Sequence, residues 1–349
     1  MTSVEEAVQK LAQEGELYEK EPDGRLHCWA CGHECRILEG KTGICRVRFN
    51  RKGKLMVPDG YVCGLQADPI EKKPFFHVLP GESALSFGML GCNFSCRFCQ
   101  NWLSSQALRD PGADAGIREI QPGQIAALAK ENGCRVIAST YNEPLVSSEW
   151  AVKILRQAKP LGLRGAFVSN GHATRKTLEY LRPWVDFYKV DIKGFDEAKY
   201  RQMTGGQMSR VLGTIEDLID LGFWVEVVTL VIPGWNDSDQ ELGAIARFLA
   251  KVSKDIPWHV TAYHPDYRMD DSRPTPPETL RRACAIGQSA GLRFVYAGNL
   301  AGRLPDSEDT VCPSCKKLLI ERSGFMIRAN RLSNGCCPKC ATKIPGVWE

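Results

Sequence analysis

The sequence predicts an α/β protein in which parallel strands alternate with helices. Seven apolar segments rich in β-branched residues are typical of buried parallel strands: residues 83–90, 134–140, 163–170, 186–193, 223–233, 258–264 and 292–298. Six amphipathic helix patterns lie between them, at residues 122–133, 147–162, 174–183, 209–222, 239–253 and 276–291. No G-x-G-x-x-G turn follows any of these strands, so the order favours a complete or partial (β/α) barrel over a dinucleotide-binding fold.

Composition sets few limits on function. The 349 residues can bury one large domain with small attachments. A net charge of +4, from 45 basic and 41 acidic residues, neither demands nor excludes nucleic-acid binding. No apolar run is long enough to span a membrane, and MTSVEEAVQKLAQEGEL predicts an acidic amphipathic helix rather than a signal peptide. We therefore expect a cytoplasmic protein.

Fifteen cysteines are many for a chain of this class, and twelve of them are clustered. In a reducing compartment, clustered cysteines are metal ligands more often than disulfide partners. Cys63, Cys134 and Cys284 stand alone. The last two fall within strand and helix patterns and are expected to be buried, whereas Cys63 has no assignment.

The segment GCNFSCRFCQN (residues 91–101, the cysteine loop) directly follows the first barrel strand and holds Cys92, Cys96 and Cys99. Three thiolates can hold three irons of a [4Fe–4S] cluster and leave the fourth iron open to a small molecule. Structural zinc sites use separated cysteine pairs instead. Chance clustering or a thiol redox motif is the alternative interpretation.

Polar residues follow the later strands. They are Asn142, Glu143, Ser169, Asn170, Asp191, Lys193 and His264. Because chemistry in such barrels gathers at the carboxyl ends of the strands, these residues are expected to meet at one mouth. The alternative is that exposed loops are polar whatever their role.

The C-x3-C-x2-C motif after the first barrel strand resembles the radical S-adenosylmethionine (SAM) superfamily. The resemblance implies a partial (β/α)6-type barrel and a [4Fe–4S] cluster held by Cys92, Cys96 and Cys99. It also implies reductive cleavage of SAM to methionine and a 5′-deoxyadenosyl radical, which abstracts hydrogen from a substrate. An electron donor such as flavodoxin or ferredoxin would supply the reducing electron.

Several segments resemble the activating enzymes of glycyl-radical proteins such as pyruvate formate-lyase: VSNG, VDIKG, LVIPGWNDSD and TAYH. This match implies SAM contacts for Asp191, Lys193 and His264, with Ser169 and Asn170 near the ribose. Glu143 of YNEP, with Asn142 beside it, would contact the methionine amino group. Val168 departs from the pattern, because activases carry an acid at that position.

A match over nearly the whole chain is to the radical SAM enzyme of the AmmeMemoRadiSam system, on CWACGHECRILEGKTGICRVR, DPIEKKPFFHVLPG, YNEP, FVYAGNL and the terminal CPSC…CPKC…IPGVW. It implies Memo-like and AMMECR1-like partner proteins.

Two alternative functions stay open: a glycyl-radical activase, and a zinc-ribbon protein that binds or modifies nucleic acid. The latter depends on the cations Lys316, Lys317, Arg322, Arg328 and Arg331. Sparse aromatic residues in the tail make nucleic acid an unexpected partner.

Two further cysteine groups predict metal sites. The tail cysteines, Cys312, Cys315, Cys337 and Cys340, form two CPxC pairs that suit zinc, or a rubredoxin-like iron, with Cys336 outside the ligand set. The N-terminal cysteines, Cys28, Cys31, Cys35 and Cys45, could hold zinc, which the knuckle-like turns favour, or an auxiliary iron–sulfur cluster. His27 or His33 could replace one of them.

The predicted domains are residues 1–80, with a helix and a cysteine-rich metal module, 81–305, the barrel, and 306–349, the zinc-ribbon or rubredoxin-like module. The charged segment 68–77 is expected to be a solvated connector. In the alternative interpretation, Lys72, Lys73 and His77 contact an anionic substrate or a partner surface.

Overall fold

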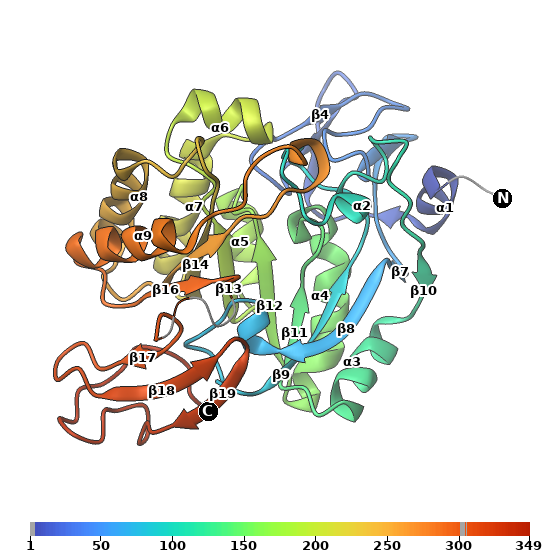
Figure 1. Ribbon diagram of the computed structural model, residues 1–349. Coiled ribbons are helices and arrows are strands. Elements are labelled where there is room, and N and C mark those ends of the chain that lie inside the picture. Colours follow the sequence, from blue (N-terminus) through green and yellow to red (C-terminus); the bar gives the residue numbers. More distant parts are fainter. Residues whose placement is uncertain (1–3, 301–303, 305) are drawn as a thin grey trace. The chain divides into compact units, whose positions relative to one another are not determined.

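A computed structural model describes residues 4–300, 304 and 306–349 (Figure 1). The chain forms two compact units, each built from separate segments. The first comprises residues 1–68, 83–188 and 201–223, and the second comprises residues 69–82, 189–200 and 224–349. The chain passes from the first unit to the second within β13 (Phe187–Asp191) and returns within α6 (Glu197–Thr204).

The first unit contains the strands that precede the cysteine loop and the polar motifs. Its strand order is β12 (Arg164–Ser169), β11 (Val136–Ser139), β9 (Ser83–Gly88) and β8 (Gly64–Pro69). β11 pairs in parallel with both neighbours, Val136 standing opposite Ala84 and Arg164. α3 (Pro122–Glu131) and α4 (Ser148–Ala158) pack against each other and against β11. The remaining helices of this unit are α1 (Val4–Leu11), α2 (Trp102–Ser105), α5 (Arg175–Leu181) and α7 (Met208–Asp220), with 3-10 turns at Pro144–Ser147 and Lys159–Leu161.

Short strands build the N-terminal part of the same unit. They pair in three small sheets: β1 (Gln13–Glu14), β6 (Lys54–Val57) and β5 (Phe49–Arg51); β2 (Tyr18–Lys20), β3 (Leu26–Cys28) and β4 (Arg36–Ile37); β10 (Arg118–Glu119) and β7 (Tyr61–Val62). Leu17, Leu26, Ile37, Leu55 and Val57 form one buried cluster among them. An ion pair between Arg48 and Glu149, both almost completely buried, ties this region to α4.

The second unit continues the strand–helix alternation. β14 (Trp224–Val231), β15 (Trp258–Ala262) and β16 (Val295–Gly298) pair in parallel. α8 (Asp239–Val252) and α9 (Pro277–Ser289) pack together, and α9 covers β15 and β16. The tail adds the antiparallel ribbon β17 (Thr310–Val311), β18 (Leu318–Ser323) and β19 (Met326–Asn330), and 3-10 turns lie at Ile70–Lys72 and Tyr267–Met269.

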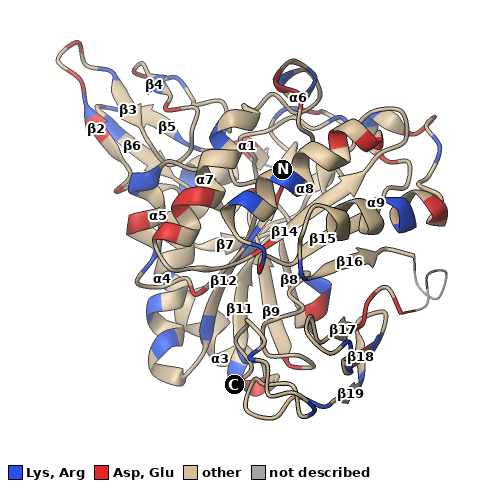
Figure 2. Cartoon of the chain, turned by 90° about the vertical axis from the view of Figure 1, so that its left-hand side faces the viewer, with Lys and Arg blue, Asp and Glu red and all other residues tan. Residues whose placement is uncertain are grey.

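Local chemistry explains where the helices begin and end. The Thr174 and Ser238 side chains cap α5 and α8 by accepting the amides of Thr177 and Glu241. Beyond α7, Gly222 adopts φ +76°, the left-handed conformation that ends helices and favours glycine. Basic and acidic residues alternate along several helices (Figure 2). Arg175 of α5, for example, bonds Asp217 of α7 at 2.8 Å.

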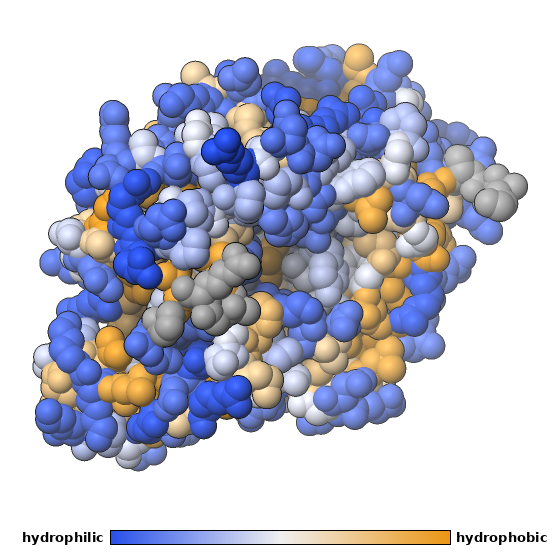
Figure 3. All heavy atoms as spheres, in the orientation of Figure 1, coloured by the Kyte–Doolittle hydropathy of each residue, from blue (hydrophilic) through white to orange (hydrophobic). Residues whose placement is uncertain are grey.

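The expected α/β class with a parallel sheet is confirmed, and each of the seven predicted strands and six predicted helices is present. α6 was not expected, and the N-terminal helix is shorter than predicted, with residues 1–3 outside the described part. The domain boundaries stay a prediction, and the one at residue 305 lies outside the described residues. Across the described ranges, no helix has the length and apolar character needed to cross a membrane. Hydrophilic residues cover most of the face in Figure 3.

The expectation of a solvated connector at residues 68–77 is wrong. Glu71, Lys73, Phe76 and His77 are buried, although Lys72 is exposed. The buried carboxylate of Glu226 compensates, because it accepts the amides of Phe76 and His77 at 3.0 and 2.8 Å. The charge run therefore belongs to the core of the second unit.

A chain of hydrogen bonds fixes the state of the His77 ring. Nδ1 lies 2.6 Å from the carbonyl oxygen of Pro345, which can only accept, so Nδ1 carries the hydrogen. Nε2 lies 2.7 Å from the Tyr296 hydroxyl, which can donate to it. Thr310 is 2.9 Å from that hydroxyl and accepts from Arg322 at 2.8 Å. Burial lowers the pKa of His77 to about 4, so the ring is neutral at neutral pH, and it links the charged segment to the tail.

Candidate functional site

The cysteine loop leaves β9 in the first unit. Cys96 is buried, whereas Cys92 and Cys99 are half-buried. The amide of Phe94 donates to the Cys92 sulfur at 3.3 Å, and the Ser105 hydroxyl lies 3.2 Å from the Cys99 sulfur. Hydrogen bonds to sulfur are a feature of iron–sulfur ligation, where they stabilise negative charge on the thiolates.

Arg109 holds the backbone of this loop. Its guanidinium donates to the carbonyl oxygens of Phe94 and Cys92, both at 2.7 Å, and also to that of Ile44. His33 Nε2 lies 2.9 Å from the carbonyl oxygen of Asn93 and must donate to it. Three consecutive carbonyls of the loop, those of residues 92–94, therefore have hydrogen-bond partners within the protein, and these bonds hold the loop in a defined shape.

Glu143 lies just beyond β11 and is 3% exposed. Its Oε1 accepts from the Ser169 hydroxyl at 2.7 Å and from the Leu145 amide at 3.1 Å, and its Oε2 accepts from the Asn170 amide at 2.7 Å. The Asn170 side chain donates to Asn93 Oδ1 at 2.7 Å. Glu143, Ser169 and Asn170 are therefore connected to the cysteine loop, as expected for strand ends that meet.

Asn142 joins two strand ends. Its Oδ1 accepts the amide of Met89 at 3.0 Å, immediately beyond β9, and its side-chain nitrogen donates to the Glu143 carbonyl at 3.3 Å. These bonds place Asn142 as a support for Glu143 and for the start of the cysteine loop.

The surroundings of Cys92 disfavour the ionised form of its thiol. Burial, and then the Glu143 carboxylate and the Cys96 thiol, raise the pKa of Cys92 well above its ordinary value. A bound cationic iron would reverse that effect, because metal ligation deprotonates a coordinating thiol outright.

Asp191, Lys193 and His264 lie in the second unit. The Lys189 and Lys193 ammonium groups bond the two Asp191 oxygens at 2.5 and 3.2 Å. Burial alone would raise the pKa of Asp191, but these two cations lower it. His264 follows β15, is exposed, and has Nδ1 3.3 Å from the carbonyl oxygen of Pro265.

Three supporting residues were missed by sequence reasoning. Asn93 lies inside the cysteine loop, so its position was a signal that could have been used. Lys189 stands two residues before Asp191 on the same strand and therefore shares its face. Arg109 follows α2 with no motif around it, and only its three-dimensional contacts reveal its role.

The lone cysteines are buried or half-buried. Cys134 is buried as expected, and Cys284 is half-buried within α9. Burial raises the pKa of Cys63 to about 12, and its thiol donates to the Met89 carbonyl at 3.0 Å.

The tail cysteines form a compact set. The Sγ atoms of Cys312, Cys315, Cys337 and Cys340 all lie within 4.8 Å of one another. Cys312 and Cys340 are 3.6 Å apart, and Cys315 and Cys337 are 3.5 Å apart. Four thiolates around one ion with bonds of about 2.3 Å would stand about 3.8 Å apart, so this group can bind a single metal ion. Cys336 is outside the set, as expected.

The N-terminal cysteines are arranged differently. Cys28, Cys31 and Cys45 are buried and Cys35 is half-buried. Burial, then the Cys28 and Cys45 thiols, raise the pKa of Cys31, so the group shares one environment. Among the residues that the structure describes, however, only the tail set brings three or more ligand atoms within 4.8 Å. His27 pairs with Glu34 at 3.7 Å, and His33 donates to Asn93, so both rings have other partners.

The nucleic-acid alternative loses part of its basis. Arg322 is buried, with its guanidinium 4.3 Å from the centre of the Phe76 ring. Arg331 pairs with Glu321 at 2.7 Å. Lys316 donates to the carbonyl oxygen of Pro313 at 3.1 Å. Three of the five tail cations therefore already have partners within the fold.

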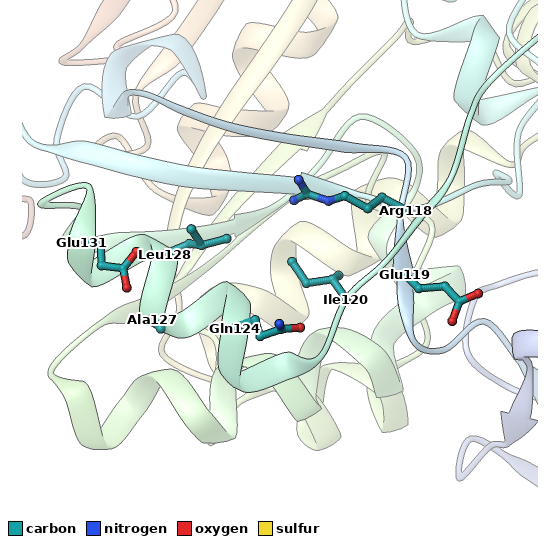
Figure 4. A pocket seen from close by; sticks show the side chains of 7 residues that line it. All are labelled: Arg118, Glu119, Ile120, Gln124, Ala127, Leu128 and Glu131. Carbon is teal, nitrogen blue, oxygen red and sulfur yellow. The ribbon is translucent and has the colours of Figure 1, made fainter.

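A separate pocket of about 430 Å³ lies between β10 and α3 in the first unit (Figure 4). Arg118, Gln124 and Leu128 are among its lining residues, and Glu131 stands at its rim. None of the predicted site residues lines it, and it joins no nucleophile to a base. The cysteine loop and Glu143 are the better candidate for chemistry.

Comparison with known proteins places this site in a family. The model of the radical SAM superfamily matches residues 88–249, a range that includes the cysteine loop, Glu143 and Asp191. An uncharacterized protein of Methanocaldococcus jannaschii is 37% identical over 336 residues, covering 95% of this chain and 98% of that protein. The chain belongs to the radical SAM superfamily. It is accordingly a SAM-dependent enzyme, as the sequence predicted.

More distant similarities are to proteins that carry names. The isethionate sulfite-lyase activating enzyme of Oleidesulfovibrio alaskensis is 26% identical over 187 residues, which are 52% of this chain and 60% of that enzyme. A crystal structure of a domain of pyruvate-formate lyase-activating enzyme from Bacteroides vulgatus shares 19% identity and a TM-score of 0.42, covering 46% of this chain and 98% of that domain.

Proposed function

We propose that this radical SAM enzyme binds a [4Fe–4S] cluster through Cys92, Cys96 and Cys99 and abstracts hydrogen from a substrate still to be identified. The observation that carries the proposal is the connection from the buried Glu143 carboxylate through Asn170 and Asn93 to the cysteine loop. A SAM molecule with its methionine group at the loop would find a carboxylate fixed beside it.

The chemistry of the loop fits such a cluster. The cysteines leave one iron of a cubane without a protein ligand. Two hydrogen bonds to sulfur already stand in place. Within the described chain, the Asn93 side-chain nitrogen is buried without a hydrogen-bond partner, so it is available to an acceptor on a bound group.

The residues around the loop have distinct tasks in this proposal. When bound, the reduced cluster supplies the electron that cleaves the sulfonium C–S bond of SAM. Glu143 would accept from the amino group of bound SAM, and Ser169 and Asn170 would lie near its ribose. From the resemblance to activating enzymes, Asp191, Lys193 and His264 would be further SAM contacts, and the Lys189 and Lys193 ammonium groups would keep Asp191 ionised. Phe94 and Phe98, both buried, keep water from the loop.

The partners in this proposal come from the resemblance to AmmeMemoRadiSam enzymes. They are Memo-like and AMMECR1-like proteins. The reductive cleavage of SAM itself calls for an electron donor, such as a flavodoxin or ferredoxin in the cytoplasm. The tail cysteines would hold zinc, with a single iron as the alternative.

Anaerobic SAM cleavage tests the core of the proposal. The protein is reconstituted with iron and sulfide, reduced and mixed with SAM, and 5′-deoxyadenosine is measured by mass spectrometry. We expect product from the wild type and from Cys134→Ala, which removes a buried cysteine far from the loop in sequence, but none from Cys96→Ala. Equal product from Cys96→Ala would refute the assignment of the cluster to this loop.

Glycyl-radical activation is the second candidate. The 26% identity to an isethionate sulfite-lyase activating enzyme favours it. Val168, half-buried in β12, stands where activases carry an acid and argues against it. A glycyl radical doublet in the EPR spectrum of a partner protein, after incubation with this enzyme and SAM, would establish activation. Its absence while SAM is being cleaved would favour a different substrate.

A further inference from the structure

We propose that the N-terminal cysteines, Cys28, Cys31, Cys35 and Cys45, hold a second [4Fe–4S] cluster beside the cysteine loop and not a zinc ion. The sequence left zinc and iron open and its turns favoured zinc. The structure separates the two, because one ion and a four-iron cluster require different spacing between the thiolates.

The tail cysteines serve as an internal reference for a single ion. Their sulfurs all lie within 4.8 Å, close to the separation of about 3.8 Å that a tetrahedral thiolate site imposes. No three sulfurs of the described N-terminal cysteines meet that limit. A cubane tolerates wider spacing, because each cysteine binds a different iron. Cys92, Cys96 and Cys99 also stand outside the limit.

The N-terminal cysteines nevertheless converge on one place. Cys28 ends β3, and its amide donates to the Cys35 carbonyl at 2.9 Å, so the two face each other across a tight loop that contains Cys31. The Cys35 sulfur lies 3.6 Å from the position of a Cβ on Gly43, two residues before Cys45. Three buried thiols and one half-buried thiol are thus brought to one small region of the fold, as a four-cysteine cluster site requires.

This group packs directly on the cysteine loop. A Cβ on Gly91, whose φ is +89°, would stand 2.6 Å from Val47 and 3.0 Å from the Cys45 carbonyl oxygen. Only glycine permits that approach. Arg109 bonds the carbonyls of both Ile44 and Cys92, and His33 bonds that of Asn93. The two cysteine groups share backbone contacts, so a cluster in one would lie next to the ligands of the other.

Metal and sulfide content of a variant without the loop cysteines tests the proposal. Cys92→Ala/Cys96→Ala/Cys99→Ala is reconstituted anaerobically, and iron, acid-labile sulfide and zinc are counted per chain. We expect about four irons and about four sulfides to remain, and both to disappear when Cys28→Ala and Cys31→Ala are added. Iron that remains without sulfide would overturn the proposal, because that iron would belong to a rubredoxin-like tail site, which contains no sulfide. Loss of all sulfide from the triple variant, with two zinc ions per chain, would overturn the proposal.

A complementary variant guards against misfolding. Cys28→Ala/Cys31→Ala alone should keep about four of the roughly eight irons of the wild type, and the reduced wild type should give an EPR spectrum with two interacting clusters. Iron content equal to that of the wild type would contradict the inference. These outcomes are independent of SAM cleavage, because a protein that fails to cleave SAM can still retain sulfide in the triple variant.

Discussion

Acidification should destabilise the protein through His77. Burial, only partly opposed by the Glu226 carboxylate, lowers the pKa of His77 from its ordinary 6.5 to about 4, and Arg322 and His259 act in the same direction as burial. In the unfolded chain His77 is therefore protonated below about pH 6.5, whereas in the folded protein it is protonated only below about pH 4. Stability is full above pH 6.5 and falls as the pH drops towards 4. At about 1.4 kcal/mol per pH unit, the total loss is about 3 kcal/mol, of which about 2 kcal/mol is lost by pH 5.

The assay compares wild type with His77→Gln, whose amide can donate to Pro345 and accept from Tyr296 but does not titrate. Urea unfolding of both proteins is followed by circular dichroism at pH 7 and pH 5, and only the difference between them is used, since other groups titrate equally in both. We expect the advantage of the wild type to shrink by about 2 kcal/mol at pH 5. A difference that is the same at both pH values would refute the reasoning, because His77 would then titrate alike in the folded and unfolded chains.

Three further outcomes follow from other contacts. Arg48→Met should lower the free energy of unfolding by about 3–5 kcal/mol, because it leaves Glu149 buried and unpaired. In urea titrations, Arg48→Met/Glu149→Leu should recover more than half of that loss. A double variant that is no more stable than the single one would contradict this. Glu143→Gln should weaken SAM binding by about tenfold to a hundredfold, because it removes a charged hydrogen-bond acceptor. The affinity is measured by equilibrium binding, with Glu131→Gln as an unaffected control. The melting temperatures of both variants are checked. Removal of the tail metal by a chelator should increase hydrogen exchange at Leu79 and Val347, whose amides bond within the tail contact; unchanged protection would mean that this contact does not depend on the metal.

Regular elements were predictable because their signals are local. The strand at 223–233 and the helix at 239–253 carry an apolar run and a 3.6-residue period that few other structures satisfy. The structure has β14 at Trp224–Val231 and α8 at Asp239–Val252. Cysteine spacing and strand position likewise predicted the cysteine loop and the tail set without any tertiary information.

Contacts between residues far apart in the chain could not be predicted from the sequence. Segment 68–77 looks solvated because its charges are read one by one, but its partner Glu226 lies about 150 residues further along the chain. The strands of the N-terminal region have two to four residues, too few for a period, and their pairing depends on tertiary contacts. Arg109 belongs to the same class, since its carbonyl partners give no signal in its own neighbourhood.

The segment Pro69–Glu82 is synthesised long before the rest of the unit to which it belongs. It leaves the ribosome early, yet it belongs to the second unit, where His77 bonds Pro345 and Leu79 bonds Val347 at the very end of the chain. During translation its apolar residues Ile70, Phe75 and Phe76 cannot be buried until the later segments of the second unit have been synthesised. The second unit is therefore among the last parts to close, and a chain shortened at its carboxyl end would present Phe75 and Phe76 to chaperones.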